Sequence, residues 1–224
     1  MIRRLADRLV DLDLLTEAAD LYDYQVRERL EGVPRAQIAI RQAMIYLLNR
    51  EPQKAIEIMR ATREPRLPAD ISQGRREVEA RALAELQRYE EALVLISQDR
   101  TLEADLLRAD IHWSSRDYGE AVPALQKVLR SVDTTSYVIE DRDRFNIMRL
   151  ALALTFMEDR RGLEGLRARF QTGMSVGDFA NSFDLLTRDE PLTGREISVI
   201  AGQIADVEKL QSYMQSYRGD FLGR

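Results

Sequence analysis

The chain has 224 residues, of which 45% are hydrophobic and 32% are charged, so it is apolar enough for a sizeable core and too highly charged for a membrane protein. Its 38 acidic and 33 basic residues are interleaved, and a net charge of −5 without a basic stripe disfavours nucleic-acid binding. The absence of cysteine excludes disulfides, thiolate metal ligands and a cysteine nucleophile.

The beginning of the sequence already has helical periodicity. Ile2, Leu5, Leu9 and Leu12 recur at steps of three and four, with no capping residue ahead of them. We therefore expect a fragment of a longer protein, and the predominance of arginine over lysine points to a GC-rich, bacterial genome. No stretch reaches the roughly 18 to 20 apolar residues that span a bilayer, and no signal-peptide core is visible. The cytoplasm is the favoured compartment, and the periplasm fits only if a signal peptide precedes this sequence.

Four stretches share one pattern of small and large residues. Each contains two alanines separated by twelve residues, and we call these eight residues the slot alanines: Ala6 and Ala18, Ala43 and Ala55, Ala80 and Ala92, Ala109 and Ala121. Apolar steps of three and four around them predict two helices, and a polar break between the helices predicts an antiparallel return. Because one hairpin cannot bury its apolar stripe alone, we expect the hairpins to stack with the slot alanines at the closest approaches.

This pattern resembles the tetratricopeptide repeat family over about residues 2–130, because that family has a small residue in its first helix, a tyrosine near the turn and an alanine early in its second helix. The alanines recur at 37, 37 and 29 residues here, which departs from the family's even period. Two long loops are expected to bulge from the array and to contain Pro34, Pro65 and Pro68: Arg29–Arg35 and Ala61–Gln73.

Residues 131–190 are expected to form a connector and a degenerate fifth hairpin. Phe145–Met157 is apolar on nearly every side, which predicts a helix that is covered all round. Ala151 keeps the first alanine slot, whereas Leu163 replaces the second. Leu166 and Phe170 continue the stripe of the return helix, and a short helix is expected around Asp178–Thr187.

Residues 191–224 predict a last helix, which Thr193 and Glu196 open as a capping box. Its apolar positions are Ile197, Ile200, Ile204, Val207, Met214 and Tyr217, interrupted by Gln211. This helix either caps the open edge of the fifth hairpin or forms the seam of a weak homo-oligomer. The sequence thus predicts an all-α fold, a right-handed α-solenoid of tetratricopeptide-like hairpins in one continuous domain, with four hairpins in residues 1–130.

Residues capable of catalysis are present without a catalytic arrangement. The single histidine, His112, occupies a slot that Leu9, Tyr46 and Leu83 fill in the other hairpins, which indicates a packed side chain. No Ser-His-Asp order, phosphate-binding glycine loop or metal-binding helix motif is present. We predict a protein that is not an enzyme and that binds neither a cofactor nor a metal.

The family resemblance implies that the first helices line a concave groove for a peptide or a partner helix. Carried across residue by residue, the groove positions are Arg3, Asp7, Gln37, Ile40, Arg41, Met44, Glu77, Arg81, Asp110 and Trp113. This mixture of charges and apolar side chains suits a protein partner, although the asparagine and lysine with which some family members clamp a carboxylate are missing. Trp113 is the favoured anchor, with packing between hairpins as its alternative, and Arg41 and Arg81 are either groove contacts or ordinary surface ion-pair residues.

Three functions fit these features. The leading hypothesis is a non-catalytic scaffold that binds a peptide or partner protein on its concave face. The second is a structural spacer or self-association module in an envelope or motility-type assembly. The third is an accessory domain fused to an enzyme that lies upstream.

Overall fold

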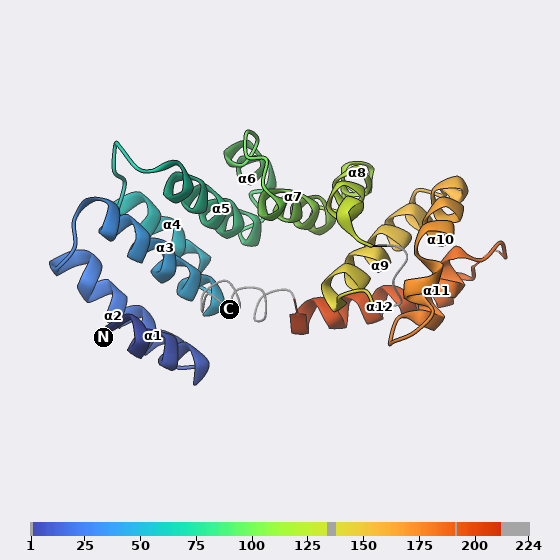
Figure 1. Cartoon of the computed structure of the whole chain (residues 1–224), viewed down its shortest axis with the longest axis horizontal. Coiled ribbons are helices and arrows are strands. Elements are labelled where there is room, and N and C mark those ends of the chain that lie inside the picture. Colours follow the sequence, from blue (N-terminus) through green and yellow to red (C-terminus); the bar gives the residue numbers. More distant parts are fainter. Residues whose placement is uncertain (1, 134–137, 191, 212–224) are drawn as a thin grey trace. The chain divides into compact units, whose positions relative to one another are not determined.

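The computed structural model describes residues 2–133, 138–190 and 192–211 (Figure 1). This part of the chain is all-α, with 77% helix and no strand, which confirms the all-α part of the prediction. Its twelve helices are α1 (Ile2–Asp11), α2 (Leu15–Glu28), α3 (Gly32–Leu48), α4 (Pro52–Ala61), α5 (Ala69–Glu85), α6 (Tyr89–Leu95), α7 (Leu102–Ser114), α8 (Tyr118–Val128), α9 (Asp141–Phe156), α10 (Arg160–Met174), α11 (Ala180–Thr187) and α12 (Gly194–Gln211), and a short 3-10 helix, η1, covers Leu129–Ser131.

The helices divide between two compact units. Unit 1 contains α1 to α6, and unit 2 contains α7 to α11 together with α12 as far as Lys209. Within unit 1 each helix contacts the next one along the chain, and α3 also contacts α5. Within unit 2 the same order runs from α7 to α11, and α11 returns to contact α9. Packing is therefore largely local in sequence, and the single continuous domain stays a prediction.

Five turns that join consecutive helices share one backbone conformation. One residue in each has a left-handed φ between 56° and 62°, and these residues are Asp13, Arg50, Gln87, Arg116 and Glu158. In the turn from α5 to α6, the backbone N–H of Arg88 donates to the carbonyl of Leu83 and that of Gln87 to the carbonyl of Ala84, both at 2.9 Å. This is the Schellman motif, which satisfies the last carbonyls of a helix. The same pair of bonds closes the other four turns, so α9 and α10 form a fifth hairpin of the same kind.

The slot alanines lie inside these hairpins, as the repeat predicts. All eight have an exposed fraction of 0 or 1%. Ala151 also keeps its slot in the fifth hairpin and is fully buried, while Leu163 fills the second slot. A Cβ on the neighbouring Gly162 would come within 2.6 Å of the Leu154 side chain, so glycine permits the close approach of α9 and α10 that alanine permits elsewhere.

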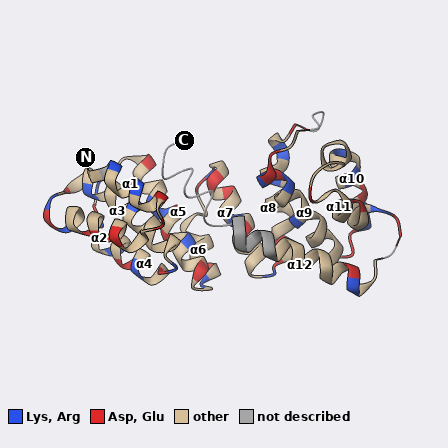
Figure 2. Ribbon diagram, turned by 90° about the horizontal axis from the view of Figure 1, so that it is seen from below, with Lys and Arg blue, Asp and Glu red and all other residues tan. Residues whose placement is uncertain are grey.

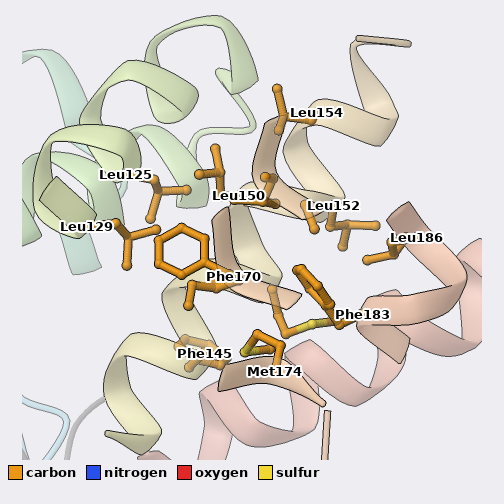
Figure 3. Close-up of a cluster of buried hydrophobic side chains, with 14 of the residues drawn as sticks. Leu125, Leu129, Phe145, Leu150, Leu152, Leu154, Phe170, Met174, Phe183 and Leu186 are labelled. Carbon is orange, nitrogen blue, oxygen red and sulfur yellow. The ribbon is translucent and has the colours of Figure 1, made fainter. Parts of the chain in front are cut away.

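The best-developed core lies in unit 2 around α9 (Figure 3). Every residue of α9 from Phe145 to Leu154 is buried, which confirms that this helix is covered all round. Figure 3 shows Phe170 of α10 next to Leu129 and Leu150, with Phe183 of α11 close to Met174. Ile200 and Ile204 of α12 belong to the same cluster, so the first half of the last helix covers this core.

Arginine side chains from neighbouring helices cover the carboxyl ends of second helices. Arg35 of α3 donates from Nε to the carbonyl of Val26 in α2 at 3.1 Å, and Arg75 of α5 donates to the carbonyl of Met59 in α4. Arg169 of α10 donates to the carbonyl of Leu129, just after α8, at 2.6 Å. The planar guanidinium offers several donors to such carbonyls, so at these positions arginine has a structural role.

Two connectors are shorter than the sequence predicted. The expected loops Arg29–Arg35 and Ala61–Gln73 reduce to residues 29–31 and 62–68, because α3 begins at Gly32 and α5 at Ala69. Pro34 therefore lies in the first turn of α3, and its expected loop position is wrong. Proline is tolerated there because the first N–H groups of a helix have no partner within it. Pro65 and Pro68 do lie in the connector before α5.

The last two helices follow the prediction closely. α11 begins two residues after Asp178 and ends at Thr187. The capping box before α12 is formed, since the backbone N–H of Thr193 donates to Glu196 Oε2 at 2.8 Å and that of Glu196 donates to Thr193 Oγ1 at 3.3 Å. Met214 and Tyr217 of the predicted seam lie outside the described residues, as do the side chains of Val207 and Gln211.

Candidate functional site

The groove positions predicted from the family resemblance lie on the first helices of four hairpins, and we call them the first-helix face. In unit 1 they are Asp7 on α1, Gln37, Ile40, Arg41 and Met44 on α3, and Glu77 and Arg81 on α5; in unit 2 they are Asp110 and Trp113 on α7. The side chain of Arg3 lies outside the described part of the chain. Apart from the exposed Gln37, these side chains are partly buried, so the face also contributes to packing.

In unit 1, the first-helix face links α1 to α3 through an ion pair. Arg41 Nη1 lies 3.7 Å from Asp7 Oδ1, and each side chain is about one-quarter exposed. The prediction for Arg41 left open whether it is a groove contact or an ion-pair residue, and the structure places it in an ion pair between consecutive hairpins. An ion pair in this setting holds two helices in register more than it adds stability, because water still screens it.

The contact between α3 and α5 is apolar at Ile40. Its Cδ1 lies 3.6 Å from the point where a Cβ on Gly74 would stand, so the two helices approach closely at this glycine. Glu77, one turn further along α5, accepts a hydrogen bond from Gln73 at 2.9 Å. Met44 and Arg81 remain partly accessible on α3 and α5. The face of unit 1 therefore combines an ion pair, an apolar contact and accessible side chains of both kinds.

In unit 2, Asp110 and Trp113 both contact Arg149 of α9. Arg149 Nη1 lies 2.7 Å from Asp110 Oδ1, and the Arg149 side chain is only 3% exposed whereas that of Asp110 is 48% exposed. The guanidinium carbon lies 5.0 Å from the centre of the Trp113 ring and 5.5 Å from that of Phe145, which is the geometry of cation–π contacts.

Trp113 also contacts an aromatic ring of the following helix. Its ring meets Tyr118 of α8 edge-on at 5.7 Å, and Tyr118 in turn lies 4.8 Å from Phe156 of α9. Trp113 is thus a partly buried member of the packing between the fourth and fifth hairpins, which is the alternative that the sequence left open for it. Sequence reasoning missed Arg149 as the residue that positions both Asp110 and Trp113.

The two ion pairs occupy the same slots in different hairpins. Asp7 and Asp110 each follow a slot alanine directly, and Arg41 and Arg149 each precede the corresponding alanine of the next hairpin by two residues. The sequence separations differ, at 34 and 39 residues, so only an alignment on the alanines reveals the equivalence. Hairpins one and two therefore stack with the same register as hairpins four and five.

His112 has a structural position at the end of α7. Its backbone carbonyl accepts the N–H of Asp117 at 2.9 Å in the turn, and its Nδ1 lies 3.5 Å from the Asp117 carboxylate. Its side chain is 16% exposed, in agreement with the packed slot that the sequence indicates.

Charged side chains of the described residues do not cluster at any one place. Figure 2 shows basic and acidic residues interspersed along the helices of each unit. Among the described residues, no three His, Asp or Glu side chains lie close enough together to hold a metal ion. In the same part of the chain, no helix has the length and apolarity needed to cross a membrane.

Buried titratable groups in both units belong to structural contacts. Burial raises the pKa of Tyr46 above its ordinary value, and a hydrogen bond from Gln42 opposes this shift. Burial also raises the pKa of the Asp143 carboxyl near the start of α9, where Arg142 partly compensates. The two groups lie in different units. Neither lies beside a nucleophile that it would activate, among the contacts of the described residues.

Comparisons with known proteins return no match. No family model, no curated protein and no solved structure is similar to this chain.

Proposed function

We propose that the protein is a non-catalytic scaffold that binds a peptide or a partner protein along the first-helix face. In this proposal the hairpins of each unit stack as a stretch of right-handed α-solenoid of the tetratricopeptide kind, and the first helices form the concave side. The observation that carries the proposal is the repeated hairpin: five equal turns, eight buried slot alanines and an ion pair that recurs in equivalent slots.

Stacked hairpins of this kind generate an extended surface instead of a pocket. Each hairpin contributes the same few positions to the surface, and side chains at those positions are free to vary while the slot alanines keep the stack together. In unit 1 the varied positions carry Met44 directly after Ala43 and Arg81 directly after Ala80. Methionine adapts to different apolar contacts, and arginine is enriched where proteins meet, so this pair suits a peptide with an apolar and an acidic side chain.

Site-specific photocrosslinking tests the proposal directly. A photoreactive phenylalanine analogue placed at Met44 should capture a partner from a lysate of the source organism, because this side chain is accessible on the first-helix face. The matched control places the same analogue at Val94, which is 72% exposed on α6, a second helix of the same unit. Equal capture at both positions would show that the first-helix face has no special role.

Negative charge introduced at Met44 and Arg81 gives a second test of the same face. Met44→Glu together with Arg81→Glu should lower recovery of the captured partner at least ~10-fold, since an acidic partner segment would then meet carboxylates. Val94→Glu controls for added negative charge. Recovery that is unchanged by the double substitution, in protein with a normal helical circular-dichroism spectrum, would contradict the proposed site.

The alternative function is a structural spacer or self-association module with no peptide on this face. One observation favours self-association, and it concerns a different surface: Leu5 on α1 and Leu12 just after this helix are large apolar side chains that are at least half exposed. Light scattering tests the self-association part of this alternative, because a chain that stays monomeric at all accessible concentrations excludes it.

A further inference from the structure

Two positions of the first-helix face recur in every hairpin, three residues before the first slot alanine and one residue after it. In the fifth hairpin, where Ala151 keeps this slot, they are Met148 and Leu152 of α9, with exposed fractions of 0% and 1%. In the other four hairpins these positions are partly buried wherever their side chains are described. Among the described residues, only the fifth hairpin is therefore completely covered at both positions.

The last two helices of the chain cover Met148 and Leu152. α11 contacts α9 in the way that α5 contacts α3, and Figure 3 shows Leu186 of α11 close to Leu152. α12 adds to this cover, since its Ile200 and Ile204 are 2% and 1% exposed and belong to one buried cluster with Met148 and Leu152. These isoleucines lie one turn apart on one side of α12, and none of the three residues between them is buried. The chain thus lays an amphipathic helix of its own over this apolar pair.

The second hairpin carries the same kind of apolar pair in a partly exposed form. Ile40 precedes Ala43 by three residues and Met44 follows it, so the two occupy the positions of Met148 and Leu152. Both side chains are partly buried. In each of the other three hairpins at least one of the two positions is charged, and the charged residues are Arg3, Asp7, Glu77, Arg81 and Asp110. The second hairpin is therefore the one that matches the covered pair of the fifth.

An apolar pair of this kind favours a helix over an extended segment. Every backbone N–H and C=O that leaves water needs a hydrogen-bond partner, and an extended segment must find these partners on the surface beneath it. The side chains of Ile40 and Met44 supply none, and Arg41 between them is paired with Asp7 at 3.7 Å. A helix satisfies its own backbone groups, so it can lie on apolar side chains without leaving them unpaired.

We propose that the Ile40–Met44 pair on α3 is the docking site for an amphipathic helix of the partner protein. This helix presents two large apolar side chains four residues apart, as α12 presents Ile200 and Ile204 to the core around α9. The inference rests on the proposed function and narrows its partner from a peptide of any conformation to a helix.

A peptide that copies α12 tests this site. The probe is fluorescein-labelled and covers residues 193–211, which include the capping box. Titrated with the full chain, it should bind with a Kd on the order of 100 μM by fluorescence anisotropy. Met44→Glu in the chain should raise the Kd at least ~10-fold, whereas Val94→Glu on α6 should leave it unchanged. The α12 of the chain itself has an effective concentration on the order of mM, so the peptide does not displace it from α9.

Changes in the peptide separate a helix from an extended segment. Ile200→Asp with Ile204→Asp should raise the Kd at least ~10-fold, and Val199→Asp, at a position that is 57% exposed in the chain, should leave it unchanged. Ala201→Pro keeps every large apolar side chain but breaks the helix, so it should weaken binding as strongly as the double substitution. Equal affinity of the proline peptide would overturn the inference, because the site would then accept an extended segment.

Photocrosslinking makes the test independent of an added charge. A chain with the photoreactive phenylalanine analogue at Met44 should crosslink to the peptide, and a chain with the analogue at Val94 should not. No binding of the peptide, or equal crosslinking at both positions, would refute the helix as occupant, and the scaffold function would stand if Met44 still captured a partner from the lysate. Equal capture from the lysate at Met44 and Val94 would instead remove the proposed function itself.

Discussion

Removing Asp110 should destabilise unit 2 more than removing its partner Arg149, although the two form one ion pair. Arg149 is almost completely buried, and its Nε has no hydrogen-bond partner among the described residues. Asp110→Ala leaves this buried cation without a counter-charge, which costs 3 to 5 kcal/mol in a fully buried site. Because Asp110 is half exposed, water already screens part of its attraction to Arg149. We therefore expect Asp110→Ala to lower the free energy of unfolding by about 2 kcal/mol.

Arg149→Met has a smaller expected effect because it removes the buried charge itself. The variant loses the contacts with the rings of Trp113 and Phe145, at about 0.5 to 1 kcal/mol each, but it also removes the desolvated guanidinium. Asp110 is left at the surface, where water solvates it. The net cost should be about 1 kcal/mol or less, and the two variants should differ in Tm by roughly 5 °C.

Urea unfolding followed by tryptophan fluorescence measures the difference in free energy of unfolding within unit 2, because Trp113 is the only tryptophan of the chain, and thermal unfolding with the same probe measures the difference in Tm. Glu164→Ala on α10, an exposed acidic residue of the same unit, controls for the loss of a carboxylate on a helix. An Asp110→Ala variant that is as stable as Arg149→Met would refute the reasoning, since the asymmetry of burial would then have no energetic consequence.

Three further predictions concern unit 1 and are measured by urea unfolding followed by circular dichroism. Gln87→Gly should stabilise the unit by up to about 1 kcal/mol, because Gln87 has a φ of 60° that glycine adopts without strain. Gln87→Val should destabilise it for the opposite reason. A lower stability of the Gln87→Gly variant would contradict the left-handed turn. Arg75→Met should cost about 2 kcal/mol, since the carbonyl of Met59 and the hydroxyl of Thr62 lose a buried donor, and a neutral result would show that these bonds carry no stability. Burial raises the pKa of Tyr46 above its unfolded value near 10, so its contribution to stability is complete below pH 10 and is lost as the pH rises through the folded-state pKa. Tyr46→Phe should remove that part of the alkaline loss, and an identical pH dependence in the variant would argue against it.

The sequence predicted the parts of the fold that depend on side-chain size. Alanines at a fixed separation indicate where helices approach closely, and all eight are buried. The uniformly apolar stretch in α9 likewise indicated a covered helix, because an apolar residue on every side leaves no surface for water. The capping box of Thr193 and Glu196 could be predicted from the sequence because both partners lie within one helical turn.

The sequence did not reveal features that depend on backbone conformation or on distant partners. The left-handed residues of the five turns are an aspartate, two arginines, a glutamine and a glutamate, none of them the glycine that normally identifies such a position. Arg149 lies 39 residues from Asp110, and nothing local to either residue marks the pair. Pro34 was misplaced because proline is compatible both with a loop and with the first turn of a helix.

The uniform turns and the unequal connectors divide the chain into segments with different tolerance for added length. Each turn is fixed by two backbone bonds at one register, whereas the connectors after α2 and α4 cover residues 29–31 and 62–68. Duplication or insertion can therefore change the spacing between hairpins and leave every hairpin intact. An epitope or a recognition sequence inserted between Pro65 and Arg66, which are both exposed, would be displayed without disturbing the buried Thr62 or its bond with Arg75. Evolution can lengthen the connector at the same place.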